Sequence, residues 1–192
     1  MNTYELIQSR RTIRKFNRQS ISAEQLKRYI DAARVAPSAA NIQPLKYIAV
    51  QSCEMTQKIF PLVRWAGYLA PDYNPCENEQ PAAYVAVCAD LSLRKSGYEL
   101  DAGAAAENLI LTALEDGVGA CWMGAIDYEK ISEILGIAEP LKLLFVIALG
   151  YHAETPSEVP CDGEGSIKYY VGSNGNLQVP KRSVDDVIIK IV

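Results

Sequence analysis

The spacing of apolar residues along the chain predicts an alternation of helices and short buried strands. The clearest helix begins after Ser22, which can form a capping box with Gln25. Its apolar positions then recur at i, i+3, i+4 and i+7, as Leu26, Tyr29, Ile30 and Ala33. Pro37 must end this helix, because the residue before a proline avoids the helical conformation.

Similar patterns predict the remaining elements. We expect helices over residues 3–10, 54–60, 98–116 and 128–135, with Leu6 and Ile7 of the first one facing inward. We expect strands over residues 47–51, 84–89, 119–126 and 142–150. Residues 161–179 should form a loop with a turn at Asn174-Gly175, and residues 183–192 a helix or a strand. The long irregular stretch 65–81 suggests a lid or a binding loop.

This order of elements favours an α+β or α/β chain with a central sheet between helices. The 192 residues suit one domain, which we take as residues 1–192. The formal net charge of −4 disfavours nucleic acid as a partner, since such binders carry a basic balance. Positive charge is nevertheless concentrated in one short stretch: Arg10, Arg11, Arg14, Lys15 and Arg18.

The cysteines and the single histidine argue against a metal site. Five cysteines lack any C-x-x-C pair, and His152 is the one histidine, so the ligands of a structural zinc site are missing. An odd number of cysteines suggests free thiols in a reducing compartment. The sequence also lacks a signal peptide and an apolar run long enough to span a bilayer. We therefore expect a cytoplasmic protein without a membrane partner.

Two basic segments are candidates for binding an anion. The first is Arg10-Arg11-Thr12-Ile13-Arg14, where Ile13 and the nearby Phe16 can anchor the segment to the core. Arginine suits phosphate because its planar group donates two parallel hydrogen bonds. The second is Lys181-Arg182, which would complete the same site if the two segments met. On composition alone, each could equally be a solvated basic surface.

Two further segments could contact a ligand through their backbone. The first, Pro37 to Pro44, exposes N–H groups between small side chains, with donors and acceptors from Ser38, Asn41 and Gln43. It could also be a plain connector. The second, residues 120–125, contains Gly124, which permits a close approach of the backbone to a ligand. It could also be a core strand in which Trp122 and Met123 pack.

No arrangement for nucleophilic or acid–base catalysis is visible, because a catalytic triad is not credible with one histidine. Nothing basic near the cysteines would lower a thiol pKa. This lack of acid–base groups fits an enzyme in which a cofactor carries the chemistry.

Taken in order, five segments resemble the nitroreductase family of FMN proteins: residues 7–16, 36–44, 117–124, 148–151 and 181–182. The resemblance implies an α+β fold with a central mixed sheet flanked by helices. It implies an intertwined homodimer with two FMN molecules in its interface. It also implies an NAD(P)H-dependent oxidoreductase that passes a hydride to flavin N5 and then to a small electron-poor acceptor, such as a nitroaromatic or a quinone, in ping-pong order.

The resemblance also assigns residues to the FMN site. Arg10 and Arg182, with Lys181 beside it, would bind the phosphate, and Arg11 and Thr12 would support the phosphate and ribityl end. Arg14 would lie near the pyrimidine side of the ring, where a cation stabilises reduced flavin. The partner subunit would supply a loop that includes Pro37, Ser38, Ala39, Asn41 and Gln43. The backbone of Met123 and Gly124 would line the ring near N5.

Some features depart from the family pattern. Leu45 stands where many relatives have tryptophan, and residues 65–81 match no relative. That stretch has Glu77 and Glu79 but no lysine or arginine, which disfavours an amino-acid zwitterion as substrate. Two other functions stay open: an FMN carrier or sensor without substantial turnover, and an interaction domain whose basic patch meets an acidic partner.

Overall fold

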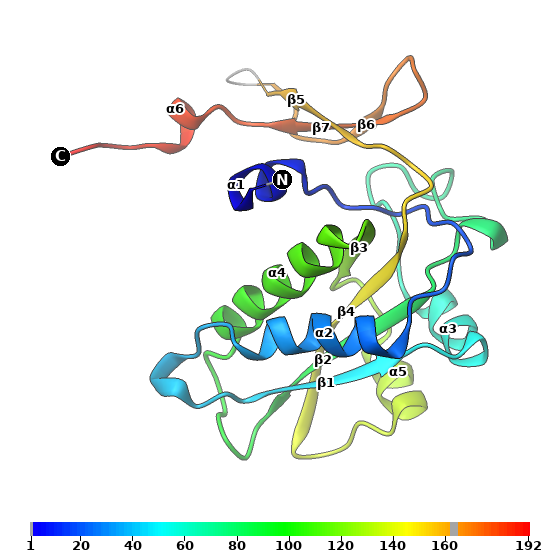
Figure 1. The fold of residues 1–192 in the computed structure, drawn as a ribbon, viewed down its shortest axis with the longest axis vertical. Coiled ribbons are helices and arrows are strands. Elements are labelled where there is room, and N and C mark those ends of the chain that lie inside the picture. Colours follow the sequence, from blue (N-terminus) through cyan, green and yellow to red (C-terminus); the bar gives the residue numbers. More distant parts are fainter. Residues whose placement is uncertain (1, 162–164) are drawn as a thin grey trace.

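The computed structural model describes residues 2–161 and 165–192, which form helices and strands (Figure 1). The α-helices are α1 (Thr3–Ser9), α2 (Ala23–Arg34), α3 (Cys53–Ile59), α4 (Glu99–Glu115), α5 (Tyr128–Leu135) and α6 (Val184–Val187). Short 3₁₀ turns are η1 (Ala39–Asn41), η2 (Phe60–Leu62) and η3 (Glu77–Glu79). The strands are β1 (Leu45–Val50), β2 (Ala83–Asp90), β3 (Val118–Met123), β4 (Leu141–Tyr151), β5 (Ser157–Pro160), β6 (Tyr170–Val171) and β7 (Leu177–Lys181).

The central sheet has four strands in the order β1-β2-β4-β3, and each neighbouring pair is antiparallel. The predicted α+β class is therefore confirmed. The sheet that we expected to be mixed is antiparallel across these four strands. A parallel contact occurs at its edge, where Thr12 forms an isolated bridge with Ala120 of β3.

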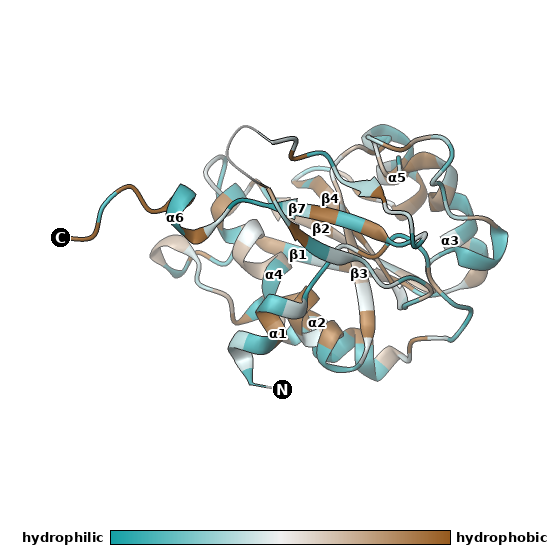
Figure 2. Cartoon of the chain, turned by 90° about the horizontal axis from the view of Figure 1, so that it is seen from above, coloured by the Kyte–Doolittle hydropathy of each residue, from teal (hydrophilic) through white to brown (hydrophobic). Residues whose placement is uncertain are grey.

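Strand β2 is buried on both faces and divides the core into two layers. Val85 and Val87 belong to one apolar cluster, which includes Leu26 and Leu109 from α2 and α4. Alternate residues such as Tyr84 point to the opposite face, because successive side chains of a strand alternate. That second cluster includes side chains from α3 and α5, namely Ile59 and Ile131. Figure 2 shows the apolar strands at the centre of the chain and hydrophilic residues on the outer helices.

Local signals placed most helix ends correctly. Ser22 and Gln25 form the predicted capping box of α2, and Asp127 caps α5 through the Lys130 N–H. Helix α1 forms as predicted, but its inward face was wrong, since none of its residues is buried and Ile7 is 45% exposed. This helix lies over α4 as a surface turn rather than inside the core (Figure 1).

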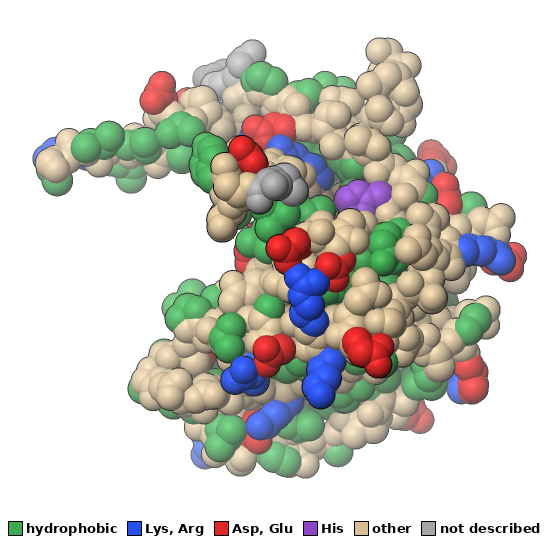
Figure 3. Space-filling model, in the orientation of Figure 1, with side chains coloured by type: hydrophobic (Ala, Val, Ile, Leu, Met, Phe, Trp, Pro, Cys, Tyr) green, Lys and Arg blue, Asp and Glu red, His purple; other side chains and the backbone are tan. Residues whose placement is uncertain are grey.

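The region after the central sheet is more ordered than predicted. Strands β5, β7 and β6 form a second sheet, so residues 161–179 are not a simple loop, although residues 162–164 lie outside the described ranges. Gly175 has a φ of 78°, which allows the predicted turn between β6 and β7. After the single turn of α6 the chain projects from the body as an apolar arm (Figure 3).

Parts of the stretch 65–81, which we expected to be a lid or a binding loop, pack against the core. Trp65 is 4% exposed and stacks near Phe16 and Phe60. The carbonyl of Glu79 accepts a hydrogen bond from the Phe16 N–H at 3.0 Å, and its carboxylate lies 3.4 Å from Lys15 Nζ. The acidic residues of this stretch therefore neutralise part of the basic segment.

The five cysteines divide into two exposed and three buried thiols. Cys53 and Cys76 are exposed, whereas Cys88, Cys121 and Cys161 are buried. Burial raises the pKa of Cys88 and of Cys121 to about 11, because a desolvated thiolate is disfavoured.

We expect two thiols to react rapidly with a disulfide reagent at pH 8, and five after unfolding in denaturant. The buried thiols should react slowly because they are inaccessible and two of them stay protonated at this pH. Released thiolate measured by absorbance, with Cys53→Ser and Cys76→Ser variants as controls, tests this. A third fast thiol in the folded protein would contradict it.

Candidate functional site

The basic segment after α1 lies extended against the edge of the central sheet. The Ile13 N–H donates to the Ala120 carbonyl at 2.9 Å, and Ile13 and Phe16 are buried, as predicted. An added Cβ at Gly119 would lie 2.6 Å from Ile13, and one at Gly150 would lie 2.7 Å from Phe16. The two glycines therefore permit an approach that a larger residue would block.

The arginines of this segment reach different acidic partners. Arg10 pairs with Glu107 of α4, with 3.2 Å between Nε and Oε1, and Arg11 pairs with Glu158 of β5. The Arg11 side chain is only 14% exposed, so its guanidinium is held tightly. These arginines are not the freely solvated surface that composition alone allowed.

Arg14 is held by an aromatic ring and by its own backbone. Its guanidinium carbon lies 4.5 Å from the centre of the Tyr169 ring, a cation–π contact. Its N–H donates to the Glu154 carboxylate, which also accepts the Tyr73 hydroxyl. Tyr169 packs in turn against Tyr68 with 4.8 Å between ring centres. Arg14 therefore lies against Tyr169, which packs on Tyr68 from a segment far away in the sequence.

The two predicted basic segments meet around Glu158. β5 pairs with β7 in parallel, and a cavity of about 620 Å³ is lined by Glu158, Lys181 and Arg182. Arg11 joins this group through its ion pair with Glu158. One cation thus pairs with Glu158, and two more line the cavity that Glu158 borders, together with Asp186. Cations of this kind suit a phosphate group.

The loop between α2 and β1 has an unusual backbone. Ala40, Asn41 and Gln43 have φ values of 52°, 55° and 53°, in the left-handed region that non-glycine residues rarely adopt. Of the described non-glycine residues with positive φ, three of four lie in this loop. Strain of this kind is concentrated at functional sites, so the loop is more than a connector.

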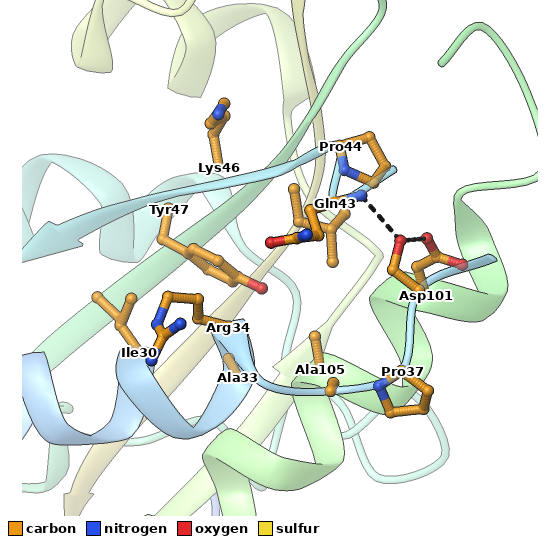
Figure 4. Close-up of a pocket in the computed structure, with 13 residues that line it drawn as sticks. Ile30, Ala33, Arg34, Pro37, Gln43, Pro44, Lys46, Tyr47, Asp101 and Ala105 are labelled. Carbon is orange, nitrogen blue, oxygen red and sulfur yellow. Dashed lines mark hydrogen bonds between the residues drawn. The ribbon is translucent and has the colours of Figure 1, made fainter. Parts of the chain in front are cut away.

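A side chain that the sequence analysis missed fixes this loop. Asp101, in the first turn of α4, accepts the Ser38 hydroxyl at 2.6 Å and the Ala39 N–H at 3.3 Å. The Ser38 oxygen accepts the Gln43 N–H at 2.9 Å, as can be followed in Figure 4. Asp101 is 5% exposed. The local sequence does not distinguish Asp101 from Glu99, an exposed acid of the same helical turn.

Behind the loop is a cavity of about 380 Å³ between α2, β1 and α4. Its labelled lining residues in Figure 4 include Ile30, Arg34, Tyr47 and Asp101. Burial raises the pKa of Tyr47 to about 12, so its phenol stays protonated. The cavity shows that the loop stands away from the sheet instead of packing onto it.

At the end of β3, the predicted residues separate into core and surface. Met123 is buried, but Trp122 is 42% exposed and packs on Phe145 with 4.6 Å between ring centres. Beside Gly124, an added Cβ would meet nothing closer than the Tyr128 hydroxyl at 4.0 Å. The chain is therefore open to a neighbour at Gly124, whereas Met123 lies in the buried strand.

These segments fall into two groups within one chain. The Thr12–Ala120 bridge places the basic segment beside β3, and Glu158 joins Arg11 to the second basic segment. The 37–44 loop instead contacts the first turn of α4. Arg10 reaches the same helix six residues later at Glu107, about 9 Å along its axis. Within one chain, the loop and Arg10 therefore contact α4 at separate places and do not meet there.

The ranges that the structure describes contain no cluster of three or more histidine, cysteine or acidic residues that could hold a metal ion. No described helix is long and apolar enough to cross a membrane.

Comparison with known proteins connects these features. A sequence model described as "Nitroreductase family" matches residues 7–74 and 94–151, which include both the basic segment and the loop. A protein from Archaeoglobus fulgidus named "Putative NADH dehydrogenase/NAD(P)H nitroreductase" is 34% identical over 77% of this chain and 83% of its own. A Bacillus subtilis protein named "FMN reductase (NADPH)" is 25% identical, over 83% of this chain and 69% of its own.

A solved structure extends the likeness to the whole fold. The structure of a nitroreductase family protein from Streptococcus pneumoniae superimposes with a TM-score of 0.72 and 21% identity, over 99% of this chain and all of that one. The fold, the matched residues and the identity to relatives agree, and the chain belongs to the nitroreductase family.

Proposed function

We propose that this chain is an FMN-dependent oxidoreductase that takes a hydride from NADH or NADPH and passes it to a small electron-poor acceptor, such as a nitroaromatic or a quinone, in ping-pong order. The observation that carries the proposal is the ion pair of Arg11 with Glu158, which lines one cavity together with Lys181 and Arg182. Family membership and the relative named FMN reductase (NADPH) support FMN as the cofactor that binds at this anion site. Residues 1–192 act as a single FMN-binding unit in this proposal.

At the phosphate end, this chain supplies cations on two elements. Lys181 ends β7 and Arg182 follows it, while Arg10 and Arg11 follow α1, so the phosphate would be bound between them. Glu158 now pairs with Arg11 and shares the cavity with the other two cations. A phosphate dianion satisfies the same donors with more oxygens than one carboxylate offers. Thr12, which forms a bridge with Ala120 of β3, would add a hydroxyl near these cations.

At the ring end, FMN supplies the hydride-transfer chemistry, and the chain supplies position and charge. Arg14 is placed near the pyrimidine side, and its stack on Tyr169 keeps the cation from swinging into solvent. The backbone of Met123 and Gly124 would line the ring near N5, where Gly124 leaves open space. No side chain of this proposal acts as an acid or a base.

The proposed enzyme is a homodimer in which the partner's 37–44 loop completes each site. On the outer side of α4, Leu100 is 85% exposed. The arm after α6 exposes further apolar side chains, including Ile189 and Val192 at about full exposure. Isolated monomers rarely leave apolar patches of this kind uncovered.

We expect light scattering on the purified protein to give twice the 21.1 kDa chain mass, because both apolar surfaces need cover. Replacing Leu100 with Glu should shift the mass toward one chain, since a charge is poorly tolerated in a buried interface. A wild-type mass of 21.1 kDa would contradict the proposed dimer.

The visible spectrum tests the cofactor and the first half-reaction together. We expect the purified protein, or the apoprotein supplied with FMN, to show a bound-flavin band that bleaches anaerobically with NADH or NADPH. Addition of a quinone should restore the band. A band that neither nucleotide bleaches would favour the carrier or sensor instead, and failure to bind FMN would overturn the proposal.

Riboflavin, which lacks the phosphate, isolates the contribution of the basic segments. We expect Arg182→Ala to weaken FMN binding roughly 10- to 100-fold, because a hydrogen bond to a charged group contributes about 1.5–3 kcal/mol. Binding of riboflavin should change little, and Lys58→Ala on the exposed side of α3 should affect neither ligand. Fluorescence titration measures all three affinities. Equal losses for FMN and riboflavin would place Arg182 away from the phosphate.

A further inference from the structure

A buried carboxylate connects the strained loop to the 17-residue helix α4. Asp101 lies in the first turn of this helix, and each of its oxygens accepts a hydrogen bond from the loop. Arg94 lies beside the same carboxylate, with 3.5 Å between Nη1 and Oδ2. Within the described ranges, Asp101 is one of three buried polar or charged residues, together with Thr56 and Gln178.

The hydrogen bonds form a chain that spans the loop. The Asp101 carboxylate accepts the Ser38 hydroxyl, and the Ser38 oxygen accepts the Gln43 N–H on the far side of the turn. The left-handed residues Ala40 and Asn41 lie between these two ends. The Ser38 hydroxyl thus donates to Asp101 and accepts from Gln43 within its own chain. Both hydrogen bonds help to shape the loop.

We propose that Asp101 is a positioning residue that holds the 37–44 loop in its left-handed conformation, so that Asn41 and the neighbouring backbone are presented to FMN. This inference rests on the proposed function for its ligand but not for its geometry. Asp101 itself need not touch FMN, because it acts through Ser38 and Ala39.

The chemistry of the carboxylate explains why an isosteric amide cannot replace it fully. Asp101 accepts one hydrogen bond on each oxygen, from Ser38 and from Ala39. Asparagine offers one acceptor oxygen and one donor nitrogen, so one of these two donors loses its partner. Asp101→Asn should therefore have a smaller effect than Asp101→Ala, which removes both acceptors.

The first arm of the test needs no flavin. In apoprotein, we expect Asp101→Ala to speed hydrogen exchange at the Ala39 and Gln43 amides at least about tenfold. The Ala39 N–H loses its acceptor, and Ser38, which accepts the Gln43 N–H, is no longer held by the carboxylate. Glu99→Ala removes a carboxylate from the same helical turn, where it is exposed, and should leave both rates within about twofold. Unchanged exchange in Asp101→Ala would overturn the proposal, whether or not the protein binds FMN.

The second arm measures FMN dissociation constants in a double-mutant cycle. We expect Asp101→Ala and Ser38→Ala each to weaken FMN binding about tenfold, and the double variant to be weakened by a similar factor. Independent sites would multiply to about 100-fold. Ser38→Ala leaves α4 intact and keeps the test usable if Asp101→Ala folds poorly, as does the isosteric Asp101→Asn.

The outcomes separate the two proposals. Altered exchange with FMN affinity within twofold of wild type would mean that Asp101 orders the loop for folding alone, and would overturn its positioning role. Multiplied losses in the double variant would also overturn it. A wild-type protein that binds no FMN would refute the proposed function, while the exchange arm would still decide whether Asp101 controls the loop.

Discussion

The contact between the basic segment and two glycines at the sheet edge is the constraint on which the site depends. Ile13 lies over Gly119 and Phe16 over Gly150, at distances that leave no room for a Cβ. Because both apolar side chains are buried, the segment cannot slide along the sheet without exposing one of them. Arg10, Arg11 and Arg14 therefore leave the sheet edge at fixed places, and each meets a different partner.

The acidic partners of these cations explain how a protein of net charge −4 keeps a concentrated basic segment. Glu107, Glu158 and Glu79 come from three parts of the chain and pair with the side chains of Arg10, Arg11 and Lys15. Glu154 accepts the backbone N–H groups of the same segment. Exposed ion pairs contribute little to stability, about 0–1 kcal/mol each. Their main effect is on position, since each carboxylate holds a long side chain where an incoming anion can compete for it. Glu158 is the clearest case, because the two basic segments share it.

How much the sequence could predict depended on whether the signal was local. Ser22, Gln25 and Asp127 marked helix ends correctly, because capping is decided within a few residues. Ile13 and Phe16 were likewise predicted as anchors from the short basic segment that contains them. The β6–β7 pairing was missed, because strands of two and five residues have no periodicity to detect. Asp101 was missed because its partners lie more than sixty residues away, and no local pattern distinguishes it from an exposed acid of the same helix.

Helix α4 links the parts of the site that one chain keeps separate. Its first turn holds the loop through Asp101, its middle holds Arg10 through Glu107, and its outer face carries the exposed Leu100. The three left-handed residues of the loop cost about 1–2 kcal/mol each. Two hydrogen bonds to a carboxylate contribute about 1.5–3 kcal/mol each, which is comparable. The two hydrogen bonds therefore offset the backbone strain within one chain, and the loop takes its shape without a partner subunit. A dimer built on α4 would then bring a preformed loop to the arginines of the other chain without the entropic cost of ordering it on assembly.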